Sequence, residues 1–128
     1  MKLAKITFRA AGVWGLLVLL PMYFLLDMVG RQDPPAVTHP EFYYGFVGVA
    51  LVWQLAFFVI GSDPRRYRPM MPITMAEKFF HVATMATLYL QGRMNIRQFA
   101  FNTPDLLWGV LFVIAFLKTP ASADRRDT

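Results

Sequence analysis

The run 42–61 contains no charged side chain, and Gln54 is its only strongly polar member. An apolar helix of roughly 18 or more residues can cross a hydrocarbon layer about 30 Å thick. Inside that layer a single run must satisfy its backbone hydrogen bonds within itself, which requires a helix. The sequence therefore predicts a transmembrane helix over residues 39–61.

Three other apolar runs predict further spans over residues 9–29, 75–92 and 103–118, and a polar tail follows at 119–128. With 128 residues, 56% of them apolar, the chain suits one domain with little left for a soluble core. The predicted fold is all-α, an integral membrane four-helix bundle. Its last span is short, because about 15 residues at ~1.5 Å each reach only about 22 Å.

Two patterns predict where these helices bend and begin. Pro21 lies inside the first run, and its missing N–H frees a carbonyl, so we expect a kink there. Thr74 and Glu77 have the spacing of a capping box, which predicts the start of the third span. In the second span, Gly45 and Gly48 are expected to permit close contact between helices.

The distribution of basic residues predicts the orientation. With four spans, the N-terminal tail, the second loop and the C-terminal tail share one side, and positive charge favours the cytoplasm. One side then holds Lys2, Lys5, Arg9, Arg65, Arg66, Arg68, Lys78, Lys118, Arg125 and Arg126, and the other holds Arg31, Arg93 and Arg97. Both termini are therefore expected to be cytoplasmic. No small-x-small cleavage site precedes Asp27, so the first run is expected to remain as an uncleaved span.

Several classes of function lack their sequence signals. The chain has no cysteine, so disulfides and thiolate metal sites are excluded. The net charge of +5 comes from residues that flank apolar runs and form no continuous patch, which argues against nucleic acid as a partner. Glu77 and His81 offer only two metal ligands, and no catalytic triad, phosphate loop or zinc motif is present. We expect no metal or cofactor, and binding rather than catalysis.

A polar stripe marks one face of the third span. Its members Glu77, His81, Thr84, Leu88 and Gln91 recur at helical spacing. Because lipid offers His81 no partner, this face should point into the bundle. One interpretation makes His81 and Thr84 part of a ligand pocket or proton path. The structural alternative, which we favour, has Glu77 capping its helix, His81 bonding a neighbouring span and the threonines bonding their own backbone.

Two other polar residues lie in or beside the spans. Asp27 ends the first span, where it could pair with a ligand cation or, as we favour, with Arg31 one turn on. Gln54 lies midway along the second span, and such a side chain more often joins helices than contacts a ligand.

Several motifs together resemble a known family. They are Pro21 with Asp27, Asp33-Pro34 with Pro40 and Phe42, the run WQLAFF from Trp53 to Phe58, His81 with Thr84, Thr87 and Leu88, and residues 106–120. In these the chain resembles the sigma-2 receptor branch of the EXPERA (emopamil-binding-protein-like) membrane proteins. That family consists of four-span proteins with cytoplasmic termini that bind sterols and amphiphilic amines.

The resemblance implies a set of ligand-binding residues. Asp27 would take the place of the acid that pairs with a ligand amine, and Asp33 that of a second acid that positions the first. Gln54, Phe57 and Phe58 would line or support the cavity.

Three departures from the family bear on activity. The link between the first two spans is shorter here, and Ala50 stands where an acid is expected. The paired His and Glu residues of the family's sterol isomerases have no clear counterpart. Isomerisation needs an acid and a base on opposite faces of the substrate, so we expect binding without this chemistry.

Three functions remain in competition, and an enzyme acting through the stripe of Glu77 and His81 is a fourth, less favoured alternative. The first is a binder of a lipophilic or sterol-like ligand, or of an amphiphilic amine, within the helix bundle. The second is an accessory or assembly subunit of a larger membrane complex, as a homodimer or with other membrane subunits. The third is a small proton-coupled transporter, which ranks last because residues 16–20 of the first span hold no carboxylate.

If a bilayer is the solvent of this chain, the protein should leave the membrane fraction only with detergent. Ultracentrifugation after carbonate washing, followed by extraction in a mild detergent, tests this. A polypeptide that stays monodisperse in plain buffer would contradict the prediction.

Overall fold

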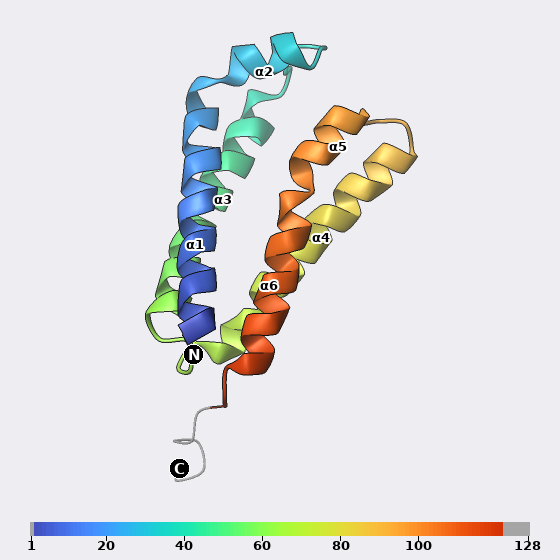
Figure 1. Cartoon of the computed structure of the whole chain (residues 1–128). Coiled ribbons are helices and arrows are strands. Elements are labelled where there is room, and N and C mark those ends of the chain that lie inside the picture. Colours follow the sequence, from blue (N-terminus) through green and yellow to red (C-terminus); the bar gives the residue numbers. More distant parts are fainter. Residues whose placement is uncertain (1, 122–128) are drawn as a thin grey trace. The chain divides into compact units, whose positions relative to one another are not determined.

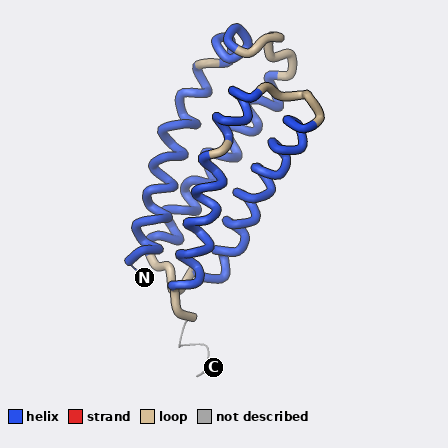
Figure 2. The backbone as a smooth tube through the Cα atoms, turned by 45° about the vertical axis from the view of Figure 1, so that its right-hand side comes forward, coloured by secondary structure: helices blue, strands red, loops and turns tan. Residues whose placement is uncertain are grey.

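The computed structural model describes residues 2–121, and within that range it contains helices and loops but no strand (Figures 1 and 2). Its elements are α1 (Lys2–Leu19), the 3-10 helix η1 (Leu20–Phe24), α2 (Leu26–Gln32), α3 (Pro40–Ser62), the 3-10 helix η2 (Arg68–Met70), α4 (Met71–Leu90), α5 (Ile96–Asn102) and α6 (Pro104–Lys118). The all-α prediction is confirmed. The predicted tail, 119–128, lies mostly outside the described residues.

Three helical stretches are long and apolar enough to cross a membrane, which identifies a membrane protein. They are Lys2–Phe24, Pro40–Ser62 and Ile96–Lys118. Helix α4 has 20 residues but is not among them. Glu77 and Lys78, with His81 one turn on, interrupt the apolar sequence of α4.

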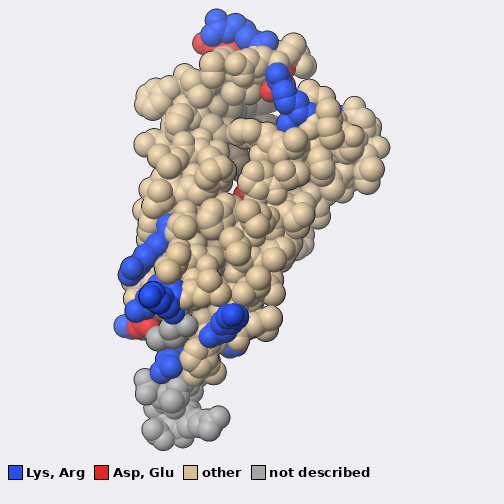
Figure 3. Space-filling view, viewed as in Figure 1, with Lys and Arg blue, Asp and Glu red and all other residues tan. Residues whose placement is uncertain are grey.

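Large apolar side chains are exposed on these helices. Leu17, Val49, Phe80 and Leu117 each have more than two-thirds of their surface exposed. On the face in Figure 3, uncharged residues cover most of the surface, and Lys and Arg stand in separate groups. Such surfaces would drive aggregation in water, whereas acyl chains solvate them.

The bounds of the first helix differ from the prediction, and its geometry changes next to Pro21. It starts at Lys2, not near residue 9, and its α-helical geometry ends at Leu19. Pro21 follows within η1, where the chain tightens to 3-10 geometry before Leu25 breaks the helix with φ −118°. The irregularity expected at Pro21 is therefore present, and the predicted span 9–29 is divided between α1, η1 and α2.

Helix α4 begins one turn earlier than predicted. Pro72 occupies its first turn, where a missing N–H costs no hydrogen bond. Thr74 is thus already inside the helix, and its hydroxyl donates to the Met71 carbonyl at 2.6 Å. The capping box predicted for Thr74 and Glu77 is wrong.

The short fourth span is also corrected. Helix α5 precedes α6, and Thr103 between them keeps helical angles of φ −71° and ψ −24°. Asn95 caps α5, because its side chain accepts from the Gln98 amide at 2.7 Å while the Gln98 side chain accepts from the Asn95 amide at 3.0 Å. The 23 residues from Ile96 to Lys118 reach about 34 Å, enough to cross a bilayer without thinning it.

The chain forms two compact units, and we describe each by itself. Unit 2 comprises Arg9–Val59. In it, small residues of α1 lie against side chains of α3: a Cβ on Gly12 would stand 2.8 Å from the Phe58 ring, and one on Gly15 would overlap Gln54.

Tyrosines join the other end of unit 2. The Tyr43 hydroxyl donates to the Met22 carbonyl at 2.6 Å, one of the carbonyls close to Pro21. A Cβ on Gly48 would stand 2.9 Å from the Tyr23 hydroxyl, whereas one on Gly45 would meet nothing within 4 Å. The close contact predicted at Gly48 is present within this unit, and that predicted at Gly45 is not.

Unit 1 comprises Met1–Phe8 and Ile60–Thr128. Helices α4 and α6 lie antiparallel and side by side in it, joined through α5 (Figures 1 and 2). Phe8 and Phe112 stack with ring centroids 4.5 Å apart, and Phe112 is fully buried. The first turns of α1 therefore lie beside the second half of α6.

The contact between Gly15 and Gln54 generates a prediction. Gly15→Ala should lower the free energy of unfolding in detergent by about 1–3 kcal/mol, because the added methyl overlaps a buried side chain. Gly45→Ala is the matched control, since it makes the same change in α3 where space is open. Equal melting temperatures for the two variants would contradict this packing.

Candidate functional site

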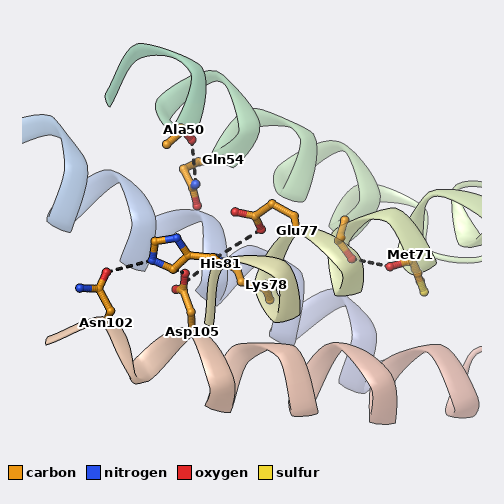
Figure 4. Close-up of polar contacts among 9 residues, drawn as sticks. Ala50, Gln54, Met71, Glu77, Lys78, His81, Asn102 and Asp105 are labelled. Carbon is orange, nitrogen blue, oxygen red and sulfur yellow. Dashed lines mark hydrogen bonds and ion pairs between the residues drawn. The ribbon is translucent and has the colours of Figure 1, made fainter. Parts of the chain in front are cut away.

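A buried lysine lies at the centre of the most polar part of unit 1. Lys78 of α4 is only 6% exposed. Its Nζ lies 3.4 Å from Asp105 Oδ1 on α6 and 3.6 Å from Glu77 Oε2 on its own helix. Figure 4 shows these side chains between α4 and α6. We call Glu77, Lys78, His81, Asn102 and Asp105 the polar cluster.

His81 occupies the other side of Asp105. Its Nε2 lies 2.9 Å from Asn102 Oδ1 and 3.8 Å from Asp105 Oδ2. The Asn102 amide nitrogen donates to the Gln98 carbonyl at 2.8 Å, which leaves Oδ1 as the acceptor facing His81. Nε2 therefore carries a hydrogen whether the ring is neutral or charged.

Local sequence explains why these five residues meet. Glu77, Lys78 and His81 lie within four positions on one side of α4. Pro104 starts α6 and places Asp105 in its first turn, where the helix dipole favours a carboxylate. A Cβ on Gly109 would stand 2.9 Å from the Phe79 ring and 3.3 Å from Lys78 Cβ, so glycine there permits the close approach of α6.

The polar cluster lies far from both ends of α4 and from both ends of the stretch Ile96–Lys118. Helix α4 is about 30 Å long at ~1.5 Å per residue. Lys78 and His81 lie about 10–15 Å from its first residue, and Asp105 lies about as far from Ile96. Ionisable groups buried between helices are costly unless they are paired, so the polar cluster is the candidate functional site.

The charges in the polar cluster are unequal. The cluster holds two carboxyl groups, those of Glu77 and Asp105, and one amine, that of Lys78, so its formal charge is −1. Glu77 Oε2 is buried and makes no hydrogen bond in the described structure, because its contact with Lys78 is too long. The arrangement can accept one more donor: a proton, an ammonium or a hydroxyl group.

Of the predicted stripe on α4, only part faces inward. His81 bonds a neighbouring helix, as the structural interpretation expects. Thr84 is exposed, and its hydroxyl donates to the Phe80 carbonyl at 2.8 Å, which also follows that interpretation. Gln91 is exposed as well, and Glu77 lies in the second turn of α4 instead of capping it.

The predicted residues of α3 lie in unit 2. Gln54 is buried, and its amide nitrogen donates to the Ala50 carbonyl at 2.8 Å. Gln54 Oε1 is buried without a hydrogen-bond partner among the described residues. Phe57 is fully buried, and Phe58 is half-buried beside Gly12.

The two predicted acids flank α2. Asp27 is exposed in the first turn of this helix, and no salt bridge joins it to Arg31 within residues 2–121. The ion pair favoured for Asp27 is therefore not observed. Asp33 is half-buried at the C-terminal cap of α2.

Three members of the polar cluster were missed by sequence reasoning. The count of basic residues places Lys78 on the cytoplasmic side, and no sequence pattern singles out Asn102 or Asp105. The signal for Lys78 was its position: an adjacent acid and base, Glu77 and Lys78, stand well inside an apolar run and one turn before His81. Asn102 gave no such signal, because only the folded helix pair brings it to His81.

The pairing of Lys78 with Asp105 generates a prediction. Asp105→Asn should lower the free energy of unfolding by about 3 kcal/mol, because it removes a carboxylate that lies 3.4 Å from a buried ammonium. Adding Lys78→Met should recover most of this loss. Chemical unfolding of the single and double variants in detergent measures the coupling.

The control is Asp27→Asn, which removes an exposed carboxylate and should change stability by less than about 0.5 kcal/mol. Additive losses in the double variant would show that Lys78 and Asp105 do not depend on each other.

Comparisons with known proteins give no match: no family model matches the chain, and no curated protein or solved structure resembles it significantly.

Proposed function

We propose that this chain is a four-span membrane protein with cytoplasmic termini that binds an amphiphilic ligand at the polar cluster, without catalysing a reaction. The ligand has an apolar body and a head that donates hydrogen bonds. A protonated amine suits the cluster best, and a sterol-like hydroxyl is the neutral alternative.

The pairing of α4 with α6 supports a fourth span. Helix α6, together with α5, is long and apolar enough to cross a bilayer, and α4 runs antiparallel beside it. A helix packed along a spanning helix over about 30 Å crosses the same layer. The charged groups of α4 turn to α6, so that lipid does not have to solvate them.

The basic residues support cytoplasmic termini. Lys78 no longer belongs in the count, because it is buried between helices. Nine basic residues then remain on the N- and C-terminal side against three on the other. In unit 1 the first turns of α1 lie beside the second half of α6. This agrees with both termini lying on the same side of the membrane.

The observation that carries the ligand proposal is the uneven charge of the polar cluster. A mid-membrane site with two carboxylates and one ammonium favours a cation over a neutral group. Glu77 Oε2 is buried and has no hydrogen-bond donor, so it can accept one from the ligand. The acids and bases of the polar cluster gather on one side of α4, whereas isomerisation needs an acid and a base on opposite faces of the substrate, so binding is the simpler function.

The resemblance to the EXPERA proteins is part of the proposal, but it implies a different binding site for the ligand amine. It would place the amine at Asp27, held by Asp33, with Gln54, Phe57 and Phe58 around it. The cluster places the amine at Glu77 and Asp105 instead. The two assignments differ in which carboxylate sets the affinity.

A thermal-shift experiment tests the proposal. Dodecyltrimethylammonium at 100 times its dissociation constant should stabilise the detergent-solubilised protein by about 2.7 kcal/mol, while dodecanol controls for the chain alone. Glu77→Gln should weaken binding about tenfold, since it removes one charged contact.

Asp27→Asn is the matched comparison. It should leave the affinity unchanged if the polar cluster holds the cation. Loss of affinity in Asp27→Asn but not in Glu77→Gln would instead support the site that the resemblance implies. No stabilisation by either compound would contradict ligand binding altogether.

A further inference from the structure

We propose that one end of unit 1 binds the headgroup of an anionic phospholipid, with the guanidinium of Arg68 as its pre-positioned contact. The ligand is a phosphate that carries acyl chains. This inference does not depend on the proposed function, because it concerns side chains outside the polar cluster and a negatively charged ligand, whereas the polar cluster suits a cation.

Arg68 of η2 is held in place by the end of α6. Its Nε donates to the Thr119 carbonyl at 2.7 Å, and its guanidinium carbon lies 4.0 Å from the Phe116 ring centroid. Thr119 is only 1% exposed, and its hydroxyl donates to the Ala115 carbonyl at 2.7 Å. The two terminal nitrogens of the guanidinium stand outside the bond to Thr119, and such a fork can donate to two oxygens of one phosphate. Because the side chain is already ordered, binding costs it little conformational entropy.

Other basic side chains lie near Arg68. Arg65 and Arg66 are exposed in the turn that leads to η2, and Lys118 is exposed in the last turn of α6. The acid in this loop, Asp63, is exposed and accepts from the backbone N–H of Arg66 at 3.3 Å. No salt bridge joins these basic side chains to a carboxylate within residues 2–121. Their positive charges can therefore meet an anion.

The first turns of α1 add positive charge to the same end of unit 1. From the stacked rings of Phe8 and Phe112, α1 runs back to its start and α6 runs on to its end in the same direction (Figure 1). Lys2 is exposed and Lys5 half-buried in these turns of α1. The fold thus gathers basic residues from segments that lie far apart in the sequence. We call this set the basic end: Lys2, Lys5, Arg65, Arg66, Arg68 and Lys118.

The basic end lies where the apolar surfaces of two helices stop. Lys118 is the last residue of the apolar stretch Ile96–Lys118, and η2 directly precedes α4. Large apolar side chains stand next to the charges, because Leu117 is 72% exposed and Ile73 in the first turn of α4 is 49% exposed. A phospholipid uses both kinds of surface, since its acyl chains contact the apolar side chains while its phosphate meets the basic ones. A free phosphate would use only the charges.

Native mass spectrometry of the detergent-solubilised protein measures the binding. Dioleoyl phosphatidylglycerol is the probe, and dioleoyl phosphatidylcholine is the control, because it has the same acyl chains without a net charge. The anionic lipid should bind at least about tenfold more tightly, since several basic residues each contribute. Glycerol 3-phosphate and inorganic phosphate, which lack the chains, should bind more weakly than the anionic lipid. Equal affinity for the two lipids, or for glycerol 3-phosphate and phosphatidylglycerol, would overturn the proposal.

Two matched substitutions test the role of Arg68. Arg68→Lys keeps the charge but loses the planar fork, so the affinity for phosphatidylglycerol should fall about tenfold. Arg65→Lys makes the same chemical change at an exposed arginine and should leave the affinity unchanged. Equal affinities of the two variants would show that only the number of charges matters, which would overturn the assignment to Arg68.

A second pair of variants keeps the test independent of folding, because it leaves the bond between Arg68 and Thr119 in place. Arg65→Gln combined with Arg66→Gln removes two exposed charges, so the affinity for phosphatidylglycerol should fall about fivefold for each. Arg93→Gln is the control, since Arg93 is exposed beyond the other end of α4 and should not contribute. An unchanged affinity in the double variant would overturn the basic end as the binding surface.

Discussion

The buried ammonium of Lys78 is the constraint on which unit 1 depends. A buried ammonium is costly unless it is paired, so α4 presents this face to a helix that carries a carboxylate. Asp105 in the first turn of α6 meets that need, and Gly109 one turn on allows the close approach. The same register brings Asn102 to His81. One ion pair thus fixes which face of α4 is inside.

Unit 2 also buries a polar side chain, but an uncharged one. Its buried polar side chain, Gln54, is uncharged and donates to the carbonyl one turn back on its own helix. Its amide nitrogen is satisfied without a partner on α1, its Oε1 has no partner among the described residues, and Gly15 provides room for the side chain. Neutral polar groups therefore let these helices pack through small residues, whereas the charges of α4 require a matching helix.

The lengths of the apolar runs predicted the existence of the long helices, because the thickness of a bilayer sets how long an apolar spanning helix must be. The positions of helix starts were less predictable, because two sequence signals competed at α4. The spacing of Thr74 and Glu77 suggested a start at Thr74, whereas the helix begins at Met71 with Pro72 in its first turn. Periodicity identified His81 as inward-facing but could not find its partners, because Asn102 and Asp105 belong to another helix. Lys78 was misplaced since charge next to a span usually lies at the interface.

The polar cluster and Asp27 differ in how much their charges cost the folded protein, and therefore in how strongly each indicates a functional role. An exposed carboxylate such as Asp27 remains in water and costs almost nothing, so its occurrence says little about use. A buried ion pair is often no more stable than apolar residues of similar volume, and an unbalanced charge is worse. Leucine at these positions would give a simpler helix pair. The chain instead keeps two acids, a lysine and a histidine together within unit 1, an arrangement that the packing of apolar helices does not by itself require.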